Sequence, residues 1–292
     1  MPVDSLDRSL KPDRNRAVAR GPAGWRHNGG VSRTLAVANQ KGGVAKTTTV
    51  ASLGAAFAEQ GLLVLLVDLD AQSCLTFSLG LDPDEIEVSV HDVLLGKATA
   101  ADAVLEAAEG VHLLPSSIDL AGAEAALLPM VGREYVLRRA LDVVSGGYDV
   151  VLLDCSPSLG VLTLNALTAA DEVLIPLQCE MLSHRGVGQL LDTIGDVQRI
   201  LNPGLTVRGI LPTMFDARTT HARAVLDDVA DRYGLPVLNP PIPRSVRFAE
   251  APAVGRSVLE TARTSKGAQA YREVGADLMR SWKIRPGRRK KP

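Results

Sequence analysis

A loop that carries two glycines and two lysines is the part of the sequence best suited to chemistry. Residues 38–50 read ANQKGGVAKTTTV, between an apolar stretch and a segment with helical spacing. The backbone N–H groups of such a loop and the N-terminus of the helix after it can bind phosphate together. Lys46, at the helix start, can reach the β- and γ-phosphates, and the Thr47 hydroxyl can bind Mg²⁺. The sequence therefore predicts a nucleotide site.

The loop departs from the common phosphate-binding pattern of Gly, four residues, Gly, Lys and then Ser or Thr. Gln40 and Ala45 stand where that pattern has its two glycines, and Lys41 is an additional cation at the mouth of the loop. A Cβ atom penalises the left-handed backbone region, so Ala45 is expected to keep a negative φ.

Carboxylates follow two of the apolar stretches. VDLDAQ carries Asp68 and Asp70, and the alternation of a strand predicts that both lie on the same side. Either could hold Mg²⁺ or orient the attacking water for phosphoryl transfer, while a turn or helix-cap role is the alternative for Asp68. Asp154 ends the stretch YDVVLLD, as in a Walker B strand. Burying a lone aspartate there is costly, and Mg²⁺ would offset that cost.

Apolar stretches alternate with helical patterns from residue 34 onward, which predicts an α/β fold with a doubly wound, mostly parallel sheet covered by helices on both faces. The predicted strands are 35–39, 63–68, 111–115, 149–154, 172–177 and 205–213. The predicted helices are 47–60, 133–145, 185–201, 219–233 and 266–282.

Composition limits the function classes. The chain has 292 residues, 46% hydrophobic and 22% charged, with a formal net charge of −1, so general adhesion to nucleic acid is not expected. We find no apolar run of membrane-spanning length and no secretory signal, which predicts a cytoplasmic protein. Three cysteines without a C-x-x-C pair and five histidines without ligand spacing argue against a disulfide framework or a metal cluster.

Both ends of the chain are basic and poor in apolar residues. We expect a disordered N-terminal arm at 1–33, one nucleotide-binding domain at 34–283 and a basic C-terminal tail at 284–292.

Taken together, these motifs resemble the ParA family of partition ATPases, in the deviant Walker A group that also includes MinD. KGGVAKTT resembles the family loop, VDLDAQ its second motif and VLLDCSPSLG its Walker B segment. The resemblance continues through MFDART and IPRSVRFAEAP to SKGAQAYREV and covers about residues 33–280. Ala45, Ala71 and Ser156 depart from residues usual in relatives, and none of the three replaces a charged group.

The resemblance implies roles for individual residues. Lys41 would reach across a nucleotide-sandwich homodimer to the partner's ATP, and Lys46 and Asp70 would complete the catalytic set, with Asp70 orienting the water. Asp154 would support Mg²⁺ together with Thr47. The residues implied to contact ATP are Lys41, Gly42, Gly43, Val44, Ala45, Lys46, Thr47 and Thr48, with Met214 and Pro243 near the adenine.

Two arginines complete the comparison with the family. Arg218 and Arg247 match positions that relatives use to hold DNA phosphate, whereas a surface ion pair is the alternative for each. The implied function is a nucleoid-associated ATPase that dimerises with ATP and Mg²⁺ and binds double-stranded DNA without sequence preference. A ParB-like centromere-binding partner would stimulate its otherwise weak hydrolysis and release it.

Other functions remain open. A MinD-like membrane ATPase would need a wide apolar face at the C-terminus, and the sequence there breaks at Pro286. A regulatory scaffold with little hydrolysis is a further alternative. The cargo, whether chromosome, plasmid or protein complex, is not encoded in these motifs.

Overall fold

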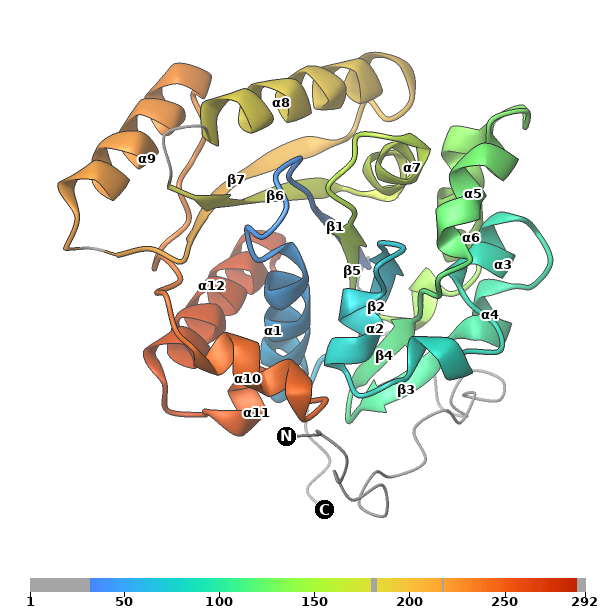
Figure 1. Cartoon of the computed structure of the whole chain (residues 1–292), viewed down its shortest axis with the longest axis horizontal. Coiled ribbons are helices and arrows are strands. Elements are labelled where there is room, and N and C mark those ends of the chain that lie inside the picture. Colours follow the sequence, from blue (N-terminus) through green and yellow to red (C-terminus); the bar gives the residue numbers. More distant parts are fainter. Residues whose placement is uncertain (1–31, 180–182, 217, 288–292) are drawn as a thin grey trace, which may run out of the picture.

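The fold is built on one twisted, mostly parallel sheet, seen in the computed structural model, which describes residues 32–179, 183–216 and 218–287 (Figure 1). Seven strands lie in the order β3-β4-β2-β5-β1-β6-β7. Only the edge pair β3–β4 is antiparallel. The strands are β1 (Arg33–Val37), β2 (Val64–Leu69), β3 (Leu105–Ala108), β4 (Val111–Leu114), β5 (Val150–Cys155), β6 (Glu172–Gln178) and β7 (Thr206–Thr213). The predicted fold class is confirmed.

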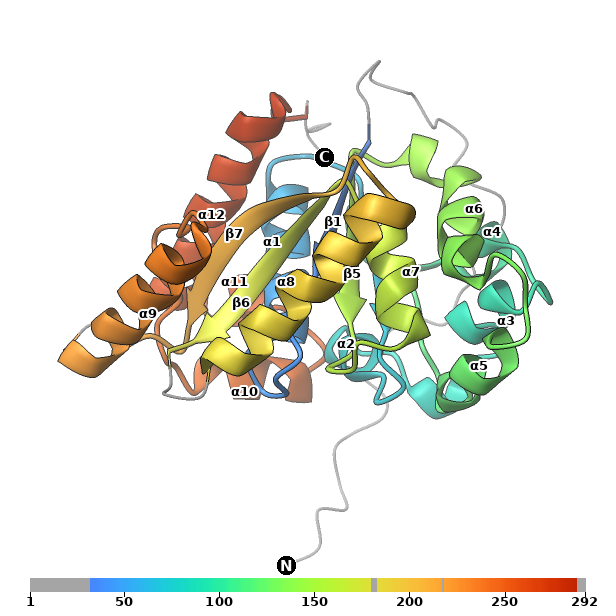
Figure 2. The ribbon, with the colours of Figure 1, turned by 90° about the horizontal axis from the view of Figure 1, so that it is seen from above.

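Helices cover both faces of the sheet, as Figure 2 shows with α8 in front of the strands and α1 and α12 behind them. One apolar core lies under α1 (Lys46–Glu59), α2 (Cys74–Ser78), α10 (Arg247–Ala253), α11 (Val258–Thr261) and α12 (Lys266–Trp282). The other lies under α3 (Val90–Leu94), α4 (Ala100–Ala103), α5 (Leu120–Leu127), α6 (Val136–Asp142), α7 (Val161–Ala169), α8 (Ser183–Ile200) and α9 (Thr220–Tyr233). Short 3₁₀ turns are η2 (Pro83–Glu85), η3 (Arg133–Tyr135) and η4 (Ser145–Gly147).

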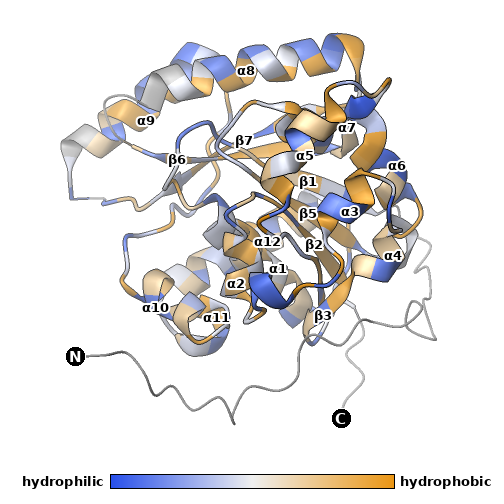
Figure 3. Ribbon diagram, turned by 45° about the vertical axis from the view of Figure 1, so that its right-hand side comes forward, coloured by the Kyte–Doolittle hydropathy of each residue, from blue (hydrophilic) through white to orange (hydrophobic). Residues whose placement is uncertain are grey.

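The six predicted strands all form, within two residues at either end, because strands covered on both faces are apolar throughout. β3 was missed: its sequence LEAA lacks β-branched and aromatic residues, and pairing with β4 holds it in place. Figure 3, coloured by residue hydropathy, shows mixed hydrophilic and hydrophobic residues along α8 and hydrophobic ones in the middle of the sheet.

The five predicted helical segments are helical, although 133–145 divides into η3 and α6. The missed helices are short or lack a polar face. α7, with the sequence VLTLNALTA, is buried on nearly every side, so it shows no helical period. Within the described residues, none of the helices is both long and apolar enough to cross a membrane.

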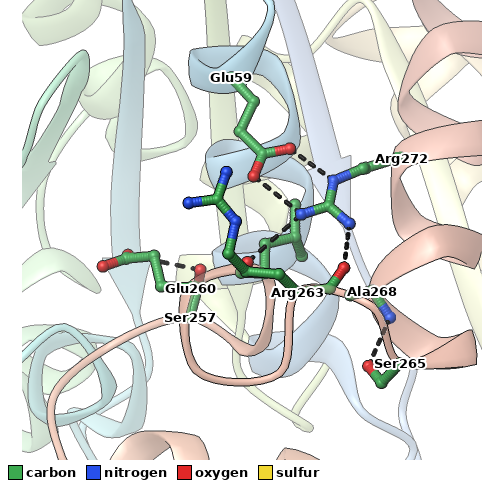
Figure 4. A network of polar contacts seen from close by, with 8 residues as sticks. Glu59, Ser257, Glu260, Arg263, Ser265, Ala268 and Arg272 are labelled. Atoms are coloured by element: carbon green, nitrogen blue, oxygen red, sulfur yellow. Dashed lines mark hydrogen bonds and ion pairs between the residues drawn. The ribbon is translucent and has the colours of Figure 1, made fainter.

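α12 braces α1 at both ends. Near the start of α1, Thr49 and the wholly buried Tyr271 share a hydrogen bond of 3.0 Å between their hydroxyls. Near its end, Glu59 accepts two hydrogen bonds from Arg272, at 2.6 and 2.9 Å (Figure 4). Arg272 also donates to the carbonyl oxygens of Arg263 and Leu259, which ties the turn after α11 to the same guanidinium.

An irregular segment, residues 236–243, covers the outer edge of β7. Ile210 N–H donates to the Pro236 carbonyl, and the Leu238 N–H donates back to Ile210, each at 2.8 Å. Ile242 N–H donates to Pro212 at 2.8 Å. The edge of the sheet is therefore paired, although no regular strand forms there.

The ends of the described chain join the fold. β1 begins at Arg33, and Ile284 packs against the core under α1. The Gly287 N–H donates to the Gln60 carbonyl at 2.9 Å. Most of the predicted arm and tail, residues 1–31 and 288–292, lies outside the described residues.

Candidate nucleotide site

The glycine loop between β1 and α1 is fixed at both ends. At its start, the Asn39 side chain donates to the Pro176 carbonyl at 2.7 Å and accepts the Lys41 N–H at 2.9 Å. Farther along, the Val44 carbonyl accepts a hydrogen bond of 3.0 Å from the Thr213 hydroxyl at the end of β7. The Val44 side chain is buried, so only its backbone is available to a ligand.

Ala45 adopts the left-handed conformation, with φ 67° and ψ 34°, so the expectation of a negative φ was wrong. The reason is the entry into α1: Ala45 is the N-cap, and its carbonyl accepts the Thr49 N–H at 2.9 Å. Gly43 is also left-handed, at φ 74°. The loop needs this geometry, and a Cβ at Ala45 costs about 1 kcal/mol there.

Lys46 is almost completely buried at the start of α1. Its ammonium donates to the Lys41 carbonyl at 3.1 Å, which folds the side chain back along the loop. Burial lowers the pKa of Lys46, and the carboxylates of Asp154 and Asp70 and the Cys155 thiol oppose that shift.

The structure distinguishes the environments of Asp68 and Asp70, which the alternation argument did not. β2 ends at Leu69, so Asp70 lies beyond the strand. The buried Asp68 carboxylate accepts the N–H of Thr76 at 2.9 Å, its hydroxyl at 2.8 Å and the Asp70 N–H at 3.2 Å. Asp68 thus fixes the turn and α2, as in its alternative role. Burial raises the pKa of Asp68 to about 6.

Asp154 lies opposite Asp68 in the register of β5 and β2. Both of its oxygens are buried, and neither has a hydrogen-bond partner of good geometry among the described residues. Burial, and then the charge of Asp68, raise the pKa of Asp154 well above its ordinary value, while the Thr47 hydroxyl and Lys46 lower it only in part. An unpartnered carboxylate beside a threonine hydroxyl fits a hard divalent cation such as Mg²⁺.

These elements enclose a cleft of about 790 Å³, within the usual range for a small-molecule site. Of the predicted residues, the cleft is lined by Gly42, Gly43, Ala45, Lys46, Thr47, Thr48, Asp70, Met214 and Pro243. Lys41, Val44 and Asp154 do not line it.

The far side of the cleft is formed by residues of the IPRSVRFAEAP and SKGAQAYREV segments to which the sequence assigned no role. Its walls include Arg244, Phe248 and Tyr271, and the rings of Phe248 and Tyr271 meet edge to face at 5.8 Å. Met214 and Pro243 are brought together because the Phe215 N–H donates to the Ile242 carbonyl at 2.9 Å. No local sequence pattern predicts these contacts. The role of Asn39 in fixing the loop was also not predicted, although its position directly before the loop was a signal for it.

The two arginines lie outside the cleft and are both ion-paired. Arg218 pairs with Asp216 at 2.9 Å, and Arg247 pairs with Glu250 at 2.8 Å. The alternative that we considered for each, a surface ion pair, is therefore observed. Both guanidinium groups remain exposed, at 90% and 60% of the side chain, and their predicted contact with DNA stays a prediction.

The chain is similar to known proteins over most of its length. The AAA_31 family, an AAA domain, matches residues 32–207. The chain is 42% identical to the sporulation initiation inhibitor protein Soj of Bacillus subtilis over 249 residues, covering 85% of this chain and 98% of that protein. It is also 42% identical to the chromosome partitioning protein ParA of Caulobacter vibrioides, covering 85% and 94% of the two chains.

Among solved structures, one of Mycobacterium smegmatis, named cobyrinic acid a,c-diamide synthase, is 62% identical with a TM-score of 0.79. The match covers 87% of this chain and 96% of that one. That structure contains an ATP analogue and magnesium.

The left-handed alanine leads to a prediction about stability. Ala45→Gly should raise the free energy of unfolding by about 1 kcal/mol, because glycine adopts positive φ without a Cβ clash. Urea unfolding would measure this. Ala55→Gly, in the interior of the same helix, is the control and should lower stability by about 1 kcal/mol. A loss of stability in both variants would contradict the strain at Ala45.

The unpartnered Asp154 leads to a second prediction. In nucleotide-free protein with a chelator, Asp154→Asn should increase stability relative to wild type at pH 7.5, because it removes an uncompensated buried charge. A carboxyl whose pKa is raised by folding stabilises the protein at low pH and loses that contribution as the pH rises through its folded pKa. The advantage of the variant should therefore shrink as the pH falls from 7.5 towards 5.

Unfolding midpoints across that pH range, with magnesium-nucleotide binding measured beside them, check this prediction. The same variant should lose magnesium-dependent nucleotide binding. A variant that is less stable than wild type at every pH would contradict our account of Asp154.

Proposed function

This chain belongs to the ParA family of P-loop NTPases, and from that we propose an ATP-driven switch that dimerises with ATP and Mg²⁺ and then binds double-stranded DNA. The observation that carries the proposal is the cleft itself. The phosphate loop and the buried Lys46 line it at the carboxyl edge of a parallel sheet, where ligands of such sheets bind, and the unpartnered Asp154 carboxylate lies close to Lys46.

The residues divide the work of phosphoryl transfer. The loop N–H groups and Lys46 would bind and orient the β- and γ-phosphates, and Thr47 and Asp154 would hold Mg²⁺, which neutralises charge on the phosphates. Asp70 lines the cleft, and its carboxylate would orient the attacking water. Met214 and Pro243 would contact the adenine. The result is hydrolysis of ATP to ADP and phosphate, slow in the absence of a partner.

Lys41 supports a two-protomer site. Its backbone carbonyl holds the Lys46 ammonium, while the residue does not line the cleft of its own chain. A lysine at the mouth of the loop can serve the partner protomer's nucleotide, as an arginine finger does in trans. Each protomer would then complete the site of the other.

Release from DNA completes the proposed cycle. Exposed arginines give affinity for the phosphate backbone without base recognition, which suits Arg218 and Arg247. A ParB-like partner would stimulate hydrolysis, separate the protomers and free the protein from the nucleoid, in the cytoplasm. Segregation of a chromosome or plasmid is the process that this cycle fits.

The name carried by the Mycobacterium smegmatis structure provides a second candidate, an amide-forming synthase. If such an enzyme took nitrogen from glutamine through a cysteine nucleophile, it would need a reactive thiolate. In this chain burial raises the pKa of Cys74, Cys155 and Cys179, that of Cys179 to about 11. The three thiols therefore disfavour that chemistry.

A membrane-positioning role is disfavoured by α12. Its apolar side, which includes Tyr271, Val274 and Leu278, is buried in the core shared with α1. Lipid binding by this helix would require it to leave the fold, which also removes Tyr271 from the nucleotide cleft.

DNA binding in defined nucleotide states tests the proposed function. Asp70→Ala, which should slow hydrolysis, is mixed with random-sequence duplex DNA and ATP, ADP or no nucleotide, across a salt series. We expect binding with ATP alone. Adding Arg218→Glu and Arg247→Glu should reduce the salt slope by roughly three to four units, since the dimer loses four phosphate contacts.

Arg199→Glu with Arg280→Glu is the matched control, because these exposed arginines make similar surface ion pairs on α8 and α12. Equal losses of DNA affinity in both double variants would show that the effect comes from overall charge. If the protein binds DNA with neither ATP nor ADP nor in the absence of nucleotide, the proposed ATP-driven switch is wrong.

Lys41→Ala tests the cross-subunit role. The variant should still bind ATP but fail to form the ATP-dependent dimer in light scattering, and its hydrolysis should fall by at least about 10³-fold, the scale of a finger residue in trans. Lys97→Ala, at an exposed lysine outside the cleft, should behave as wild type. A normal dimer in Lys41→Ala would reject the role.

A further inference from the structure

The ion pair of Arg218 differs in kind from the other surface pairs around it. Arg218 Nε donates to Asp216 Oδ1 at 3.0 Å, and its Nη2 donates to Oδ2 at 2.9 Å. The pair is therefore bidentate, with both carboxylate oxygens engaged. Arg247 instead makes a single contact, from Nη1 to Glu250 Oε2 at 2.8 Å. Surface ion pairs are usually weak, and bidentate geometry is the main exception.

The edge of the guanidinium that Asp216 occupies is one that phosphate can use. Two parallel N–H donors of arginine match the oxygens of a carboxylate and of a phosphate equally well. Arg218 cannot direct Nε and Nη2 to a DNA phosphate in this way while Asp216 holds both. Carboxylate and phosphate therefore compete for one set of donors.

The carboxylate is held in place independently of the guanidinium. The backbone N–H of Arg218 donates to Asp216 Oδ1 at 3.0 Å, so the turn itself orients the acid. Hydrogen bonding from the Arg218 side chain lowers the pKa of Asp216 to about 2, and the group stays ionised at physiological pH.

The pair also lines a second cleft, of about 620 Å³, beside the nucleotide cleft. The two clefts share Pro243 and Arg244. Arg218, Arg244 and Lys266 provide three cations to the second cleft, against the carboxylates of Asp216 and Glu273. The net charge of these five side chains is thus +1, and neutralising Asp216 would raise it to +2.

We propose that Asp216 is a built-in competitor of DNA phosphate at Arg218, which holds the DNA affinity of each protomer down. This inference rests on the proposed function. DNA binding must displace the Asp216 carboxylate from Arg218 or bring it close to a phosphate, and both cost free energy. Because a dimer engages two such sites at once, weak contact by each protomer leaves the monomer unbound while the dimer still binds.

The central experiment compares Asp216→Asn with wild type, as full-length protein with a non-hydrolysable ATP analogue and random-sequence duplex DNA. Asparagine keeps an oxygen that can accept the Arg218 backbone N–H, so the turn should persist. We expect the affinity to rise roughly two- to fivefold per protomer and about tenfold for the dimer, as the value of a good surface pair implies. Binding without nucleotide should become measurable at low salt.

Two controls separate the pair from simple charge. Asp231→Asn removes one negative charge from exposed α9, outside both clefts, and should have a smaller effect. In an Arg218→Ala background, Asp216→Asn should change affinity no more than Asp231→Asn does, because the acid acts through Arg218. Glu250→Gln should give the smaller gain expected of a single contact. Nucleotide affinity, equal in all variants, verifies that each is folded.

The outcomes distinguish this inference from the proposed function. If wild type binds DNA with the analogue and Asp216→Asn binds equally or more weakly, the acid positions Arg218 and our inference is overturned, while the switch stands. An effect of the same size in the Arg218→Ala background would also overturn it. If neither wild type nor Asp216→Asn binds DNA in any state, both proposals are overturned.

Discussion

The constraint on which the site depends is the pairing of two carboxylates, Asp68 and Asp154, on neighbouring central strands. The charge of Asp68 raises the pKa of Asp154, so the negative charge of each buried carboxylate needs its own compensation. Asp68 obtains it from three donors on the turn and on α2, which also places Asp70 at the cleft. Among the described residues, Asp154 has no hydrogen-bond donor of good geometry, and a hard cation such as Mg²⁺ would supply the compensation that it lacks.

The phosphate loop depends in turn on residues far away in the sequence. α1 is held near its start by Tyr271 and near its end by Arg272, two consecutive residues of α12. The Thr213 hydroxyl fixes the loop from β7. The AAA domain match ends at residue 207, yet Met214, Pro243 and Tyr271 complete the cleft. The last part of the chain is thus part of the site.

Much of the fold and of the phosphate loop could be predicted from the sequence alone. Strands buried on both faces are apolar throughout, and the spacing of glycine, lysine and threonine identifies the phosphate loop. The features that were predicted wrongly or not at all depend on tertiary contacts. The conformation of Ala45 is imposed by the entry into α1, the different environments of Asp68 and Asp70 by the end of β2 at Leu69, and β3 by its pairing with β4. The wall of the cleft at Phe248 and Tyr271 joins segments with no shared local pattern.

The segment that covers the edge of β7 has a consequence for crowding. Pro236, Pro240, Pro241 and Pro243 all lie in residues 236–243, and proline has no N–H to offer a further strand. An open sheet edge is a template for aggregation, and proline on the outermost position blocks it. Copies of this protein at high local concentration are therefore kept from joining their sheets edge to edge through β7.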